Sequence, residues 1–161
     1  MTLDAVANTG SAEGKNNIVA ERMTVQGDLR TLSPEQLART KATMKAIVVA
    51  NLGHTTATIT FDDGYPPMAP TDGNRRLLAL HDQASRDLGL GAVQPVDPSK
   101  AGAADVSFVA GIVPMIIDGV GLAGHDDHSP QETADLTSMS VRAKRAAVTL
   151  HRLSKLATTQ P

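Results

Sequence analysis

"TLSPEQLART" (residues 31–40) decides how the first half of this 161-residue chain is organised. Ser33 is a suitable N-cap, Pro34 fits the first helical position, and Gln36 stands where a capping box places Glu or Gln. Apolar residues then recur at helical spacing until a glycine-containing stop at residues 51–53. They are Leu37, Met44, Ile47 and Val48. The stretch therefore predicts an amphipathic helix from Pro34 to this stop.

The segments on both sides of this helix have the pattern of strands. "TLDAVANT" (2–9) and "RMTVQGDLR" (22–30) alternate apolar and polar residues, and a glycine-rich turn (10–16) separates them. In the second of them Met23, Val25 and Leu29 share one face. "HTTATITF" (54–61) follows the helix with the same alternation. Such alternation is typical of half-buried strands, so we expect a small antiparallel α+β layer.

A stretch rich in proline and glycine, "DDGYPPMAPTDGN" (62–74), predicts a boundary that separates domains 1–70 and 71–161. Beyond it we expect a helix over 74–89 and the start of another within 103–110. The continuous apolar run "VPMIIDG" (113–119) predicts a strand covered on both faces.

A long amphipathic helix is expected from Thr137 to about Lys155. Its predicted buried stripe consists of Met139, Ala143, Ala146, Ala147, Leu150 and Leu153. Its predicted solvated face carries the basic residues Arg142, Lys144, Arg145, Arg152 and Lys155. The pattern of helix 74–89 similarly predicts a stripe of Leu77, Leu78, His81, Ala84 and Leu88.

Composition excludes several classes of function. A formal charge of −2 gives no electrostatic footprint for nucleic acid, and aromatic residues, at 2%, are too few for a base-stacking platform. No apolar run approaches the length of a membrane helix, so no membrane partner is expected. The absence of cysteine excludes thiolate ligands and leaves the compartment open. A cytoplasmic location is favoured because the first residues lack the pattern of a secretory signal.

"GHDDHSP" (124–130) is the stretch with the clearest chemical content. It places His125, Asp126, Asp127 and His128 in consecutive positions. Imidazole and carboxylate groups are good ligands for Zn²⁺, and α/β folds bind ligands in the loops that follow the carboxyl ends of strands. Catalytic zinc requires at least three protein ligands. The stretch therefore predicts either part of a metal site or a charged surface loop.

Arg30 is the second candidate, because it ends a predicted strand whose polar face also carries Asp28. A guanidinium with an amide such as Asn17 nearby can clamp a substrate carboxylate. The alternative is a surface salt bridge from Arg30 to Asp28 or Glu21. Nucleotide-binding and serine-hydrolase motifs are absent from the sequence, and Ser107 and Ser129 have no base that the sequence can show.

Taken together, these stretches resemble the M-twenty zinc metallopeptidases, the family of carboxypeptidase G, acetylornithine deacetylase and succinyl-diaminopimelate desuccinylase. "NNIVAERMTVQGDLR" (16–30) matches the family's Asn-Ile/Val turn and the strand that ends in Asp-x-Arg. "AGAADVSFVA" (101–110), "VPMIIDGVG" (113–121) and "DDHSPQETADLTSM" (126–139) match its C-terminal run. The motifs agree in order and spacing from about residue 3 to residue 156.

The resemblance implies a partial ferredoxin-like lid domain that mediates dimerisation, followed by the C-terminal part of an α/β zinc-hydrolase domain. It assigns metal binding to His128, and contacts with the substrate to Asn17, Arg30 and Gly102. Asp105 is expected to cap the helix that follows the Gly102 loop. His54 does not match the family's lid histidine, and Ala20 replaces the usual proline. The loop 101–105 also has fewer glycines than many relatives.

The implied activity is hydrolysis of an amide bond next to a free carboxylate, in a small N-acyl amino acid or dipeptide, by a homodimer with a two-zinc centre. The family's His-x-Asp ligand, bridging Asp and Glu-Glu pair have no counterpart in this sequence. We therefore expect the chain alone to be inactive. The alternative is a non-catalytic dimerisation or binding module.

Overall fold

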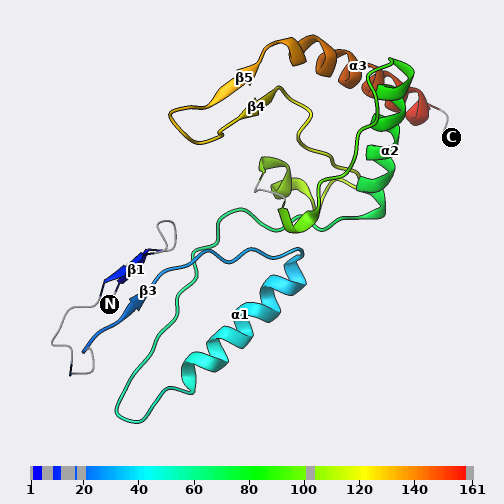
Figure 1. The fold of residues 1–161 in the computed structure, drawn as a ribbon. Helices are drawn as coiled ribbons and strands as arrows, with labels where there is room; N and C mark the ends of the chain where they lie inside the picture. Colours follow the sequence, from blue (N-terminus) through cyan, green and yellow to red (C-terminus); the bar gives the residue numbers. More distant parts are fainter. Residues whose placement is uncertain (1, 5–8, 12–16, 18–20, 101–103, 159–161) are drawn as a thin grey trace. The chain divides into compact units, whose positions relative to one another are not determined.

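The computed structural model describes residues 2–4, 9–11, 17, 21–100 and 104–158, which fall into two compact units, Met1–Thr31 and Leu32–Pro161. The first unit contains a three-stranded sheet in the order β2-β1-β3 (Figure 1). Strand β1 (Thr2–Asp4) pairs antiparallel with β2 (Thr9–Ser11) and parallel with β3 (Thr24–Val25). The expected domain boundary near residue 70 stays a prediction.

The predicted strand over 22–30 is shorter than its alternating pattern, and residues 5–8 of the predicted strand 2–9 lie outside the described residues. Residues 22–30 contribute only the two residues of β3, and Met23 and Val25 are exposed. The start of the predicted turn, Gly10 and Ser11, belongs to β2, and residues 12–16 lie outside the described residues. An alternating segment becomes a long strand only where a neighbouring backbone and a covering layer are present.

The second unit begins with α1 (Pro34–Val49), and its N-terminus confirms the capping prediction. The Ser33 hydroxyl accepts a hydrogen bond from the Gln36 amide at 3.1 Å. The Gln36 side chain in turn accepts one from the Leu32 amide at 2.7 Å. These reciprocal bonds satisfy backbone groups that a helix end leaves open, which is why the local sequence located the start correctly.

The predicted strand over 54–61 is wrong, because these residues adopt no regular structure. The end of this segment instead contacts α1 through side chains. The ammonium group of Lys41 lies 5.3 Å from the centre of the Phe61 ring, and that of Lys45 lies 5.9 Å from it. Lys41 also forms an ion pair with Asp63. Contacts between a helix and side chains thus replace the sheet hydrogen bonds that the pattern predicted.

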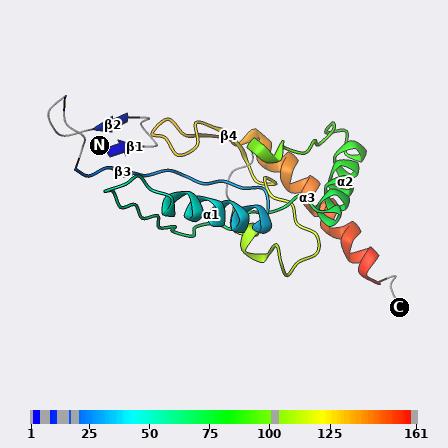
Figure 2. The same cartoon turned by 90° about the horizontal axis from the view of Figure 1, so that it is seen from below.

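Helices α2 (Asp72–Asp87) and α3 (Thr137–Thr158) pack side by side (Figures 1 and 2). Thr71 caps α2 by accepting a hydrogen bond from the Asn74 amide at 3.1 Å. The expected stripe is confirmed at Leu77, His81 and Ala84, which are buried. Within the described residues no helix is long and apolar enough to cross a membrane.

The face of α3 that contacts α2 includes polar residues, and the predicted orientation of this helix is wrong. Met139 and Leu150, from the predicted buried stripe, are 53% and 66% exposed. Thr149, which the pattern did not select, is buried, and its hydroxyl donates to the Arg145 carbonyl at 2.8 Å. The same hydroxyl lies 3.0 Å from His81 Nδ1. Because the single proton of the hydroxyl is already donated to the Arg145 carbonyl, we assign Nδ1–H of His81 as the donor in this contact.

Basic residues of the predicted solvated face contribute to these contacts. Arg152 donates to Asp87 of α2 at 2.5 Å, and Arg142 donates to the Gly119 carbonyl at 3.1 Å. The Nε atom of Arg145 is buried. Polar pairs between α2 and α3 are therefore part of this contact, which the apolar periodicity did not predict.

The predicted strand over 113–119 is also wrong, because this segment is held by α2 and not by a sheet. The Asn74 side chain donates to the Ala69 carbonyl at 3.3 Å and accepts from the Ile116 amide at 2.9 Å. Ile116 is only 7% exposed, while Val113 is 42% exposed. The apolar run thus includes one core residue, Ile116, in an irregular segment.

Gly73→Ala should destabilise the chain by about 1–3 kcal/mol, the usual cost of overpacking. A Cβ atom at Gly73 would overlap the Pro114 carbonyl oxygen, which is backbone and cannot turn aside. This is opposite in sign to the usual benefit of alanine in a helix. Urea unfolding measures the change. Gly53→Ala is the control, since a Cβ there meets no atom within 4 Å. Equal stability of the two variants would contradict the close approach.

Stability should fall as the pH drops below about 6.5, the ordinary value for histidine. Burial, and then the charge of Arg145, lower the pKa of His81. The folded state thus binds fewer protons than the unfolded state between the lowered pKa and 6.5, and stability rises with pH in that window. Urea unfolding from pH 4.5 to 8 should show this slope, and His81→Gln should reduce it. An identical slope in the variant would rule out His81 as its source.

Candidate functional site

The histidine-aspartate stretch forms the tip of a β-hairpin. Strand β4 (Ala123–His125) pairs antiparallel with β5 (Thr133–Asp135), and His125 lies opposite Thr133 (Figure 1). Gly124 permits this pairing, because a Cβ atom there would lie 2.5 Å from the Thr133 carbonyl oxygen. The strand after which the sequence placed this loop is absent from 113–119, and the hairpin itself presents the candidate ligands.

The backbone of the hairpin tip is strained at two candidate residues. Asp126 and His128 have φ angles of 59° and 64°, in the left-handed region that non-glycine residues rarely occupy. Ser129 stabilises this turn, since its amide and its hydroxyl both donate to the Asp126 carbonyl, at 3.2 and 2.7 Å. Ser129 therefore has a structural role. Strain that persists in a loop is often associated with function.

Asp135 connects the hairpin to α3, a role that the sequence analysis missed. Its carboxylate accepts hydrogen bonds from the Thr137 hydroxyl at 2.6 Å and the Thr137 amide at 2.9 Å. These bonds, and more weakly the charge of His125, lower the pKa of Asp135. An Asp two residues before a Thr at a helix start is the local signal that could have revealed it.

The hairpin does not by itself form a metal site. His125, Asp126, Asp127 and His128 are all exposed. Among the described residues there is no group of three or more His, Asp or Glu side chains that could hold an ion together. Since a catalytic zinc requires at least three protein ligands, the described part of the chain does not supply a complete ligand set for such a centre.

The candidate carboxylate clamp lies in the first unit. Arg30 Nε donates to Asp28 at 2.7 Å, and both side chains are largely exposed, so the surface pair considered as the alternative is present. Such a pair contributes roughly 0–1 kcal/mol, and a ligand carboxylate could displace Asp28 at little cost. Asn17 is exposed in a turn. His128 belongs to the second unit.

Gly102, the predicted substrate-loop residue, lies outside the described residues. The capping role expected for Asp105 is wrong: the short helix η2 (Asp105–Val109) has Ala104 at its N-cap and no side-chain capping bond. Asp105 instead accepts a hydrogen bond from the Tyr65 hydroxyl at 2.9 Å. This bond raises the pKa of Tyr65 and joins η2 to the proline-rich segment.

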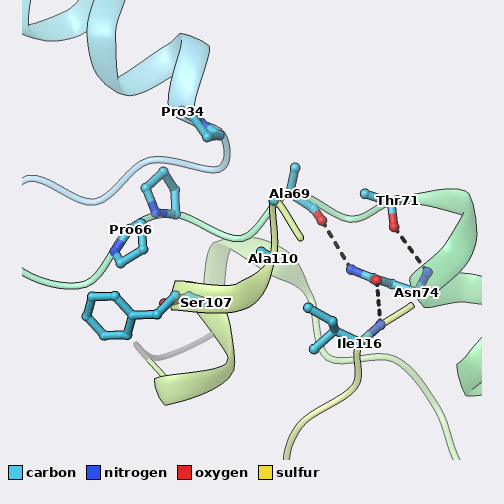
Figure 3. A pocket seen from close by; sticks show the side chains of 11 residues that line it. Pro34, Pro66, Ala69, Thr71, Asn74, Ser107, Ala110 and Ile116 are labelled. Atoms are coloured by element: carbon cyan, nitrogen blue, oxygen red, sulfur yellow. Dashed lines mark hydrogen bonds between the residues drawn. The ribbon is translucent and has the colours of Figure 1, made fainter. Parts of the chain in front are cut away.

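Next to this contact lies a cleft of about 320 Å³ that the sequence analysis did not anticipate (Figure 3). Pro34, Pro66, Ser107, Phe108 and Ile116 contribute to its wall. The start of α1 at Pro34 and the proline-rich segment come together here with η2, and no short motif signals this, because the lining residues are far apart in the sequence.

The histidine hairpin and the Arg30 segment are the stretches from which the sequence predicted a metal-dependent hydrolase. The family comparison settles the class: the model for peptidase family M20/M25/M40 matches residues 3–152. The chain therefore belongs to this family of metallopeptidases. Neither the curated proteins nor the solved structures gave a match. The match confirms the family that the motifs indicated, and it leaves the subfamily open.

The strained backbone at His128 gives a stability prediction. His128→Gly should be more stable than His128→Ala by about 1 kcal/mol, because a left-handed φ is costly for a residue with a Cβ atom and free for glycine. Thermal unfolding of the two variants measures the difference. The same pair at His151, within α3, is the control and should give the opposite order, with alanine more stable. Alanine favoured at both positions would contradict the left-handed turn.

Proposed function

We propose that this chain is the C-terminal part of a zinc-dependent amidohydrolase that cleaves an amide bond next to a free carboxylate, in the manner of glutamate carboxypeptidases. The observation that carries the proposal is the family match, which extends over residues 3–152 and includes both the Arg30 segment and the histidine hairpin. Supporting it, the hairpin holds His128 exposed at a strained turn, where its imidazole is accessible to a metal ion bound by residues from another part of the enzyme.

His128 is the proposed metal ligand, and His125 is not. His128 precedes Ser129 and the acidic stretch from Glu132 to Asp135, as the ligand does in the family that the sequence resembles. In the hairpin, His125 belongs to strand β4 whereas His128 lies in the turn. This difference in backbone environment supports treating the two histidines as separate candidates.

Arg30 and Asn17 are the proposed contacts to the substrate carboxylate, and Gly102 is a proposed residue of the substrate pocket. A guanidinium binds a carboxylate through two parallel hydrogen bonds, which an exposed and weakly paired side chain such as Arg30 can offer. The substrate class is therefore a small N-acyl amino acid or dipeptide. The proposed assembly is a homodimer through the lid domain, residues 1–70.

The remaining metal ligands and the general base are proposed to come from outside this chain. The absence of a three-ligand group among the described residues supports this, and so the chain alone is proposed to be inactive. The same observation supports a second candidate, a non-catalytic dimerisation or binding module that retains the family fold. The zinc content of a complete enzyme that includes this chain separates the two.

In such a complete enzyme, His128→Ala should remove about half of the bound zinc, because one ion of a two-metal centre loses a ligand. His125→Ala should leave the zinc content unchanged and is the matched control. Elemental analysis of the dialysed proteins measures both. Equal zinc loss in the two variants would assign the metal to a joint site, and no loss in either would favour the binding module.

Arg30→Ala should reduce kcat/KM for a substrate with a free carboxylate by roughly 10- to 150-fold, equivalent to about 1.5–3 kcal/mol for hydrogen bonds to a charged group. The corresponding amide substrate should be affected far less. Arg39→Ala, an exposed arginine on α1, is the control. If Arg30 serves only as the surface partner of Asp28, both substrates will be hydrolysed at nearly the parental rate.

A further inference from the structure

We propose that the cleft between Pro34, the proline-rich segment and η2 binds a small, neutral, largely apolar molecule that carries one hydrogen-bonding group. The proposal is independent of the hairpin and of the proposed amide hydrolysis, because none of the residues assigned to either lines this cleft. It rests on the chemistry of the wall, on one buried hydroxyl and on the size of the space.

The wall is apolar and conformationally restricted. Pro34, Pro66 and Pro67 contribute rings with a fixed φ and no backbone N–H, so they offer contact area without donors. Phe108 and Ile116 add an aromatic and a branched aliphatic surface. None of the residues that line the cleft carries a charge. A wall of this kind favours an uncharged ligand, because nothing in it compensates the desolvation of an ion.

Most of the polar atoms in the wall are already engaged. Asn74 uses its side chain on the Ala69 carbonyl and the Ile116 amide, and the Thr71 hydroxyl accepts from the Asn74 amide (Figure 3). The Ser107 hydroxyl is the exception, since it is buried and has no hydrogen-bond partner among the described residues. Because an unpaired buried hydroxyl is unfavourable, a ligand that pairs with it gains specific affinity.

The dimensions and the rim of the cleft define the ligand further. A volume of about 320 Å³ lies at the lower end of the range for small-molecule sites. Phe108 is 59% exposed and stacks on Tyr65 at a ring distance of 5.1 Å in a tilted arrangement. Tyr65 in turn holds the Asp105 carboxylate, which places a negative charge near this rim. A neutral aromatic or aliphatic alcohol therefore fits, and an anion does not.

Phenol and benzoate are the probes that test this, added at pH 7 to the isotopically labelled 161-residue chain. Phenol is neutral at this pH and can pair with Ser107, while benzoate has the same ring and a negative charge. Phenol should produce saturable amide shifts that concentrate at Ser107, Ala110 and Gly111, and benzoate should bind at least tenfold more weakly. Scattered or non-saturating shifts, or equal affinity for the two probes, would overturn the proposal.

Two variants locate the site. Gly111→Leu should abolish phenol binding, because Gly111 lines the cleft and a Cβ atom there meets no atom within 4 Å, so the side chain can enter the open space. Gly53→Leu makes the same change in open surroundings elsewhere and should bind phenol normally. Ser107→Ala should fold normally and weaken phenol roughly 2- to 10-fold, the effect of one neutral hydrogen bond. Unchanged affinity in both cleft variants would place phenol elsewhere.

Discussion

The close approach of α2 to the segment around Pro114 is the constraint on which most of the second unit depends. Gly73 lets the first turn of the helix touch the Pro114 carbonyl, and Asn74, one residue later, fixes the Ile116 amide at 2.9 Å. These contacts use the side of α2 that a larger residue at position 73 would block. They fix the irregular segment 113–119 in place of sheet hydrogen bonds, and they form one wall of the cleft beside η2.

The position of the candidate metal ligand follows from a second set of polar contacts. Asp135 and Ser138 tie the hairpin to the first turn of α3, since Thr137 donates to the Asp135 carboxylate and the Ala123 amide donates to the Ser138 hydroxyl at 3.0 Å. Helix α3 is in turn held on α2 through Thr149 and Arg152. Helix α3 therefore connects the α2–α3 contact to the hairpin that carries the candidate ligand.

The proposed metal role of His128 rests on the family match, because the geometry alone offers one exposed imidazole at a strained turn and no complete ligand set among the described residues. The proposed metal centre, with its other ligands from outside this chain, accounts for a candidate ligand that stands alone in the hairpin. The exposed apolar residues of α3, Met139 and Leu150, have the pattern of a buried face and no partner layer in the described residues.

The sequence by itself determined what short-range chemistry controls. The start of α1 follows from Ser33, Pro34 and Gln36, the extent of α2 from its stripe and the extent of α3 from its periodicity, since helix bonds and caps connect neighbours along the chain. The metallopeptidase family could also be predicted from the sequence, because its motifs are local. Only the tertiary structure decided that 54–61 and 113–119 are not strands, and that Asp105 pairs with Tyr65. It also decided that α3 turns Thr149 and not Leu150 toward α2. These outcomes depend on which distant backbone or side chain is available as a partner, and apolar spacing along one segment carries no information about that.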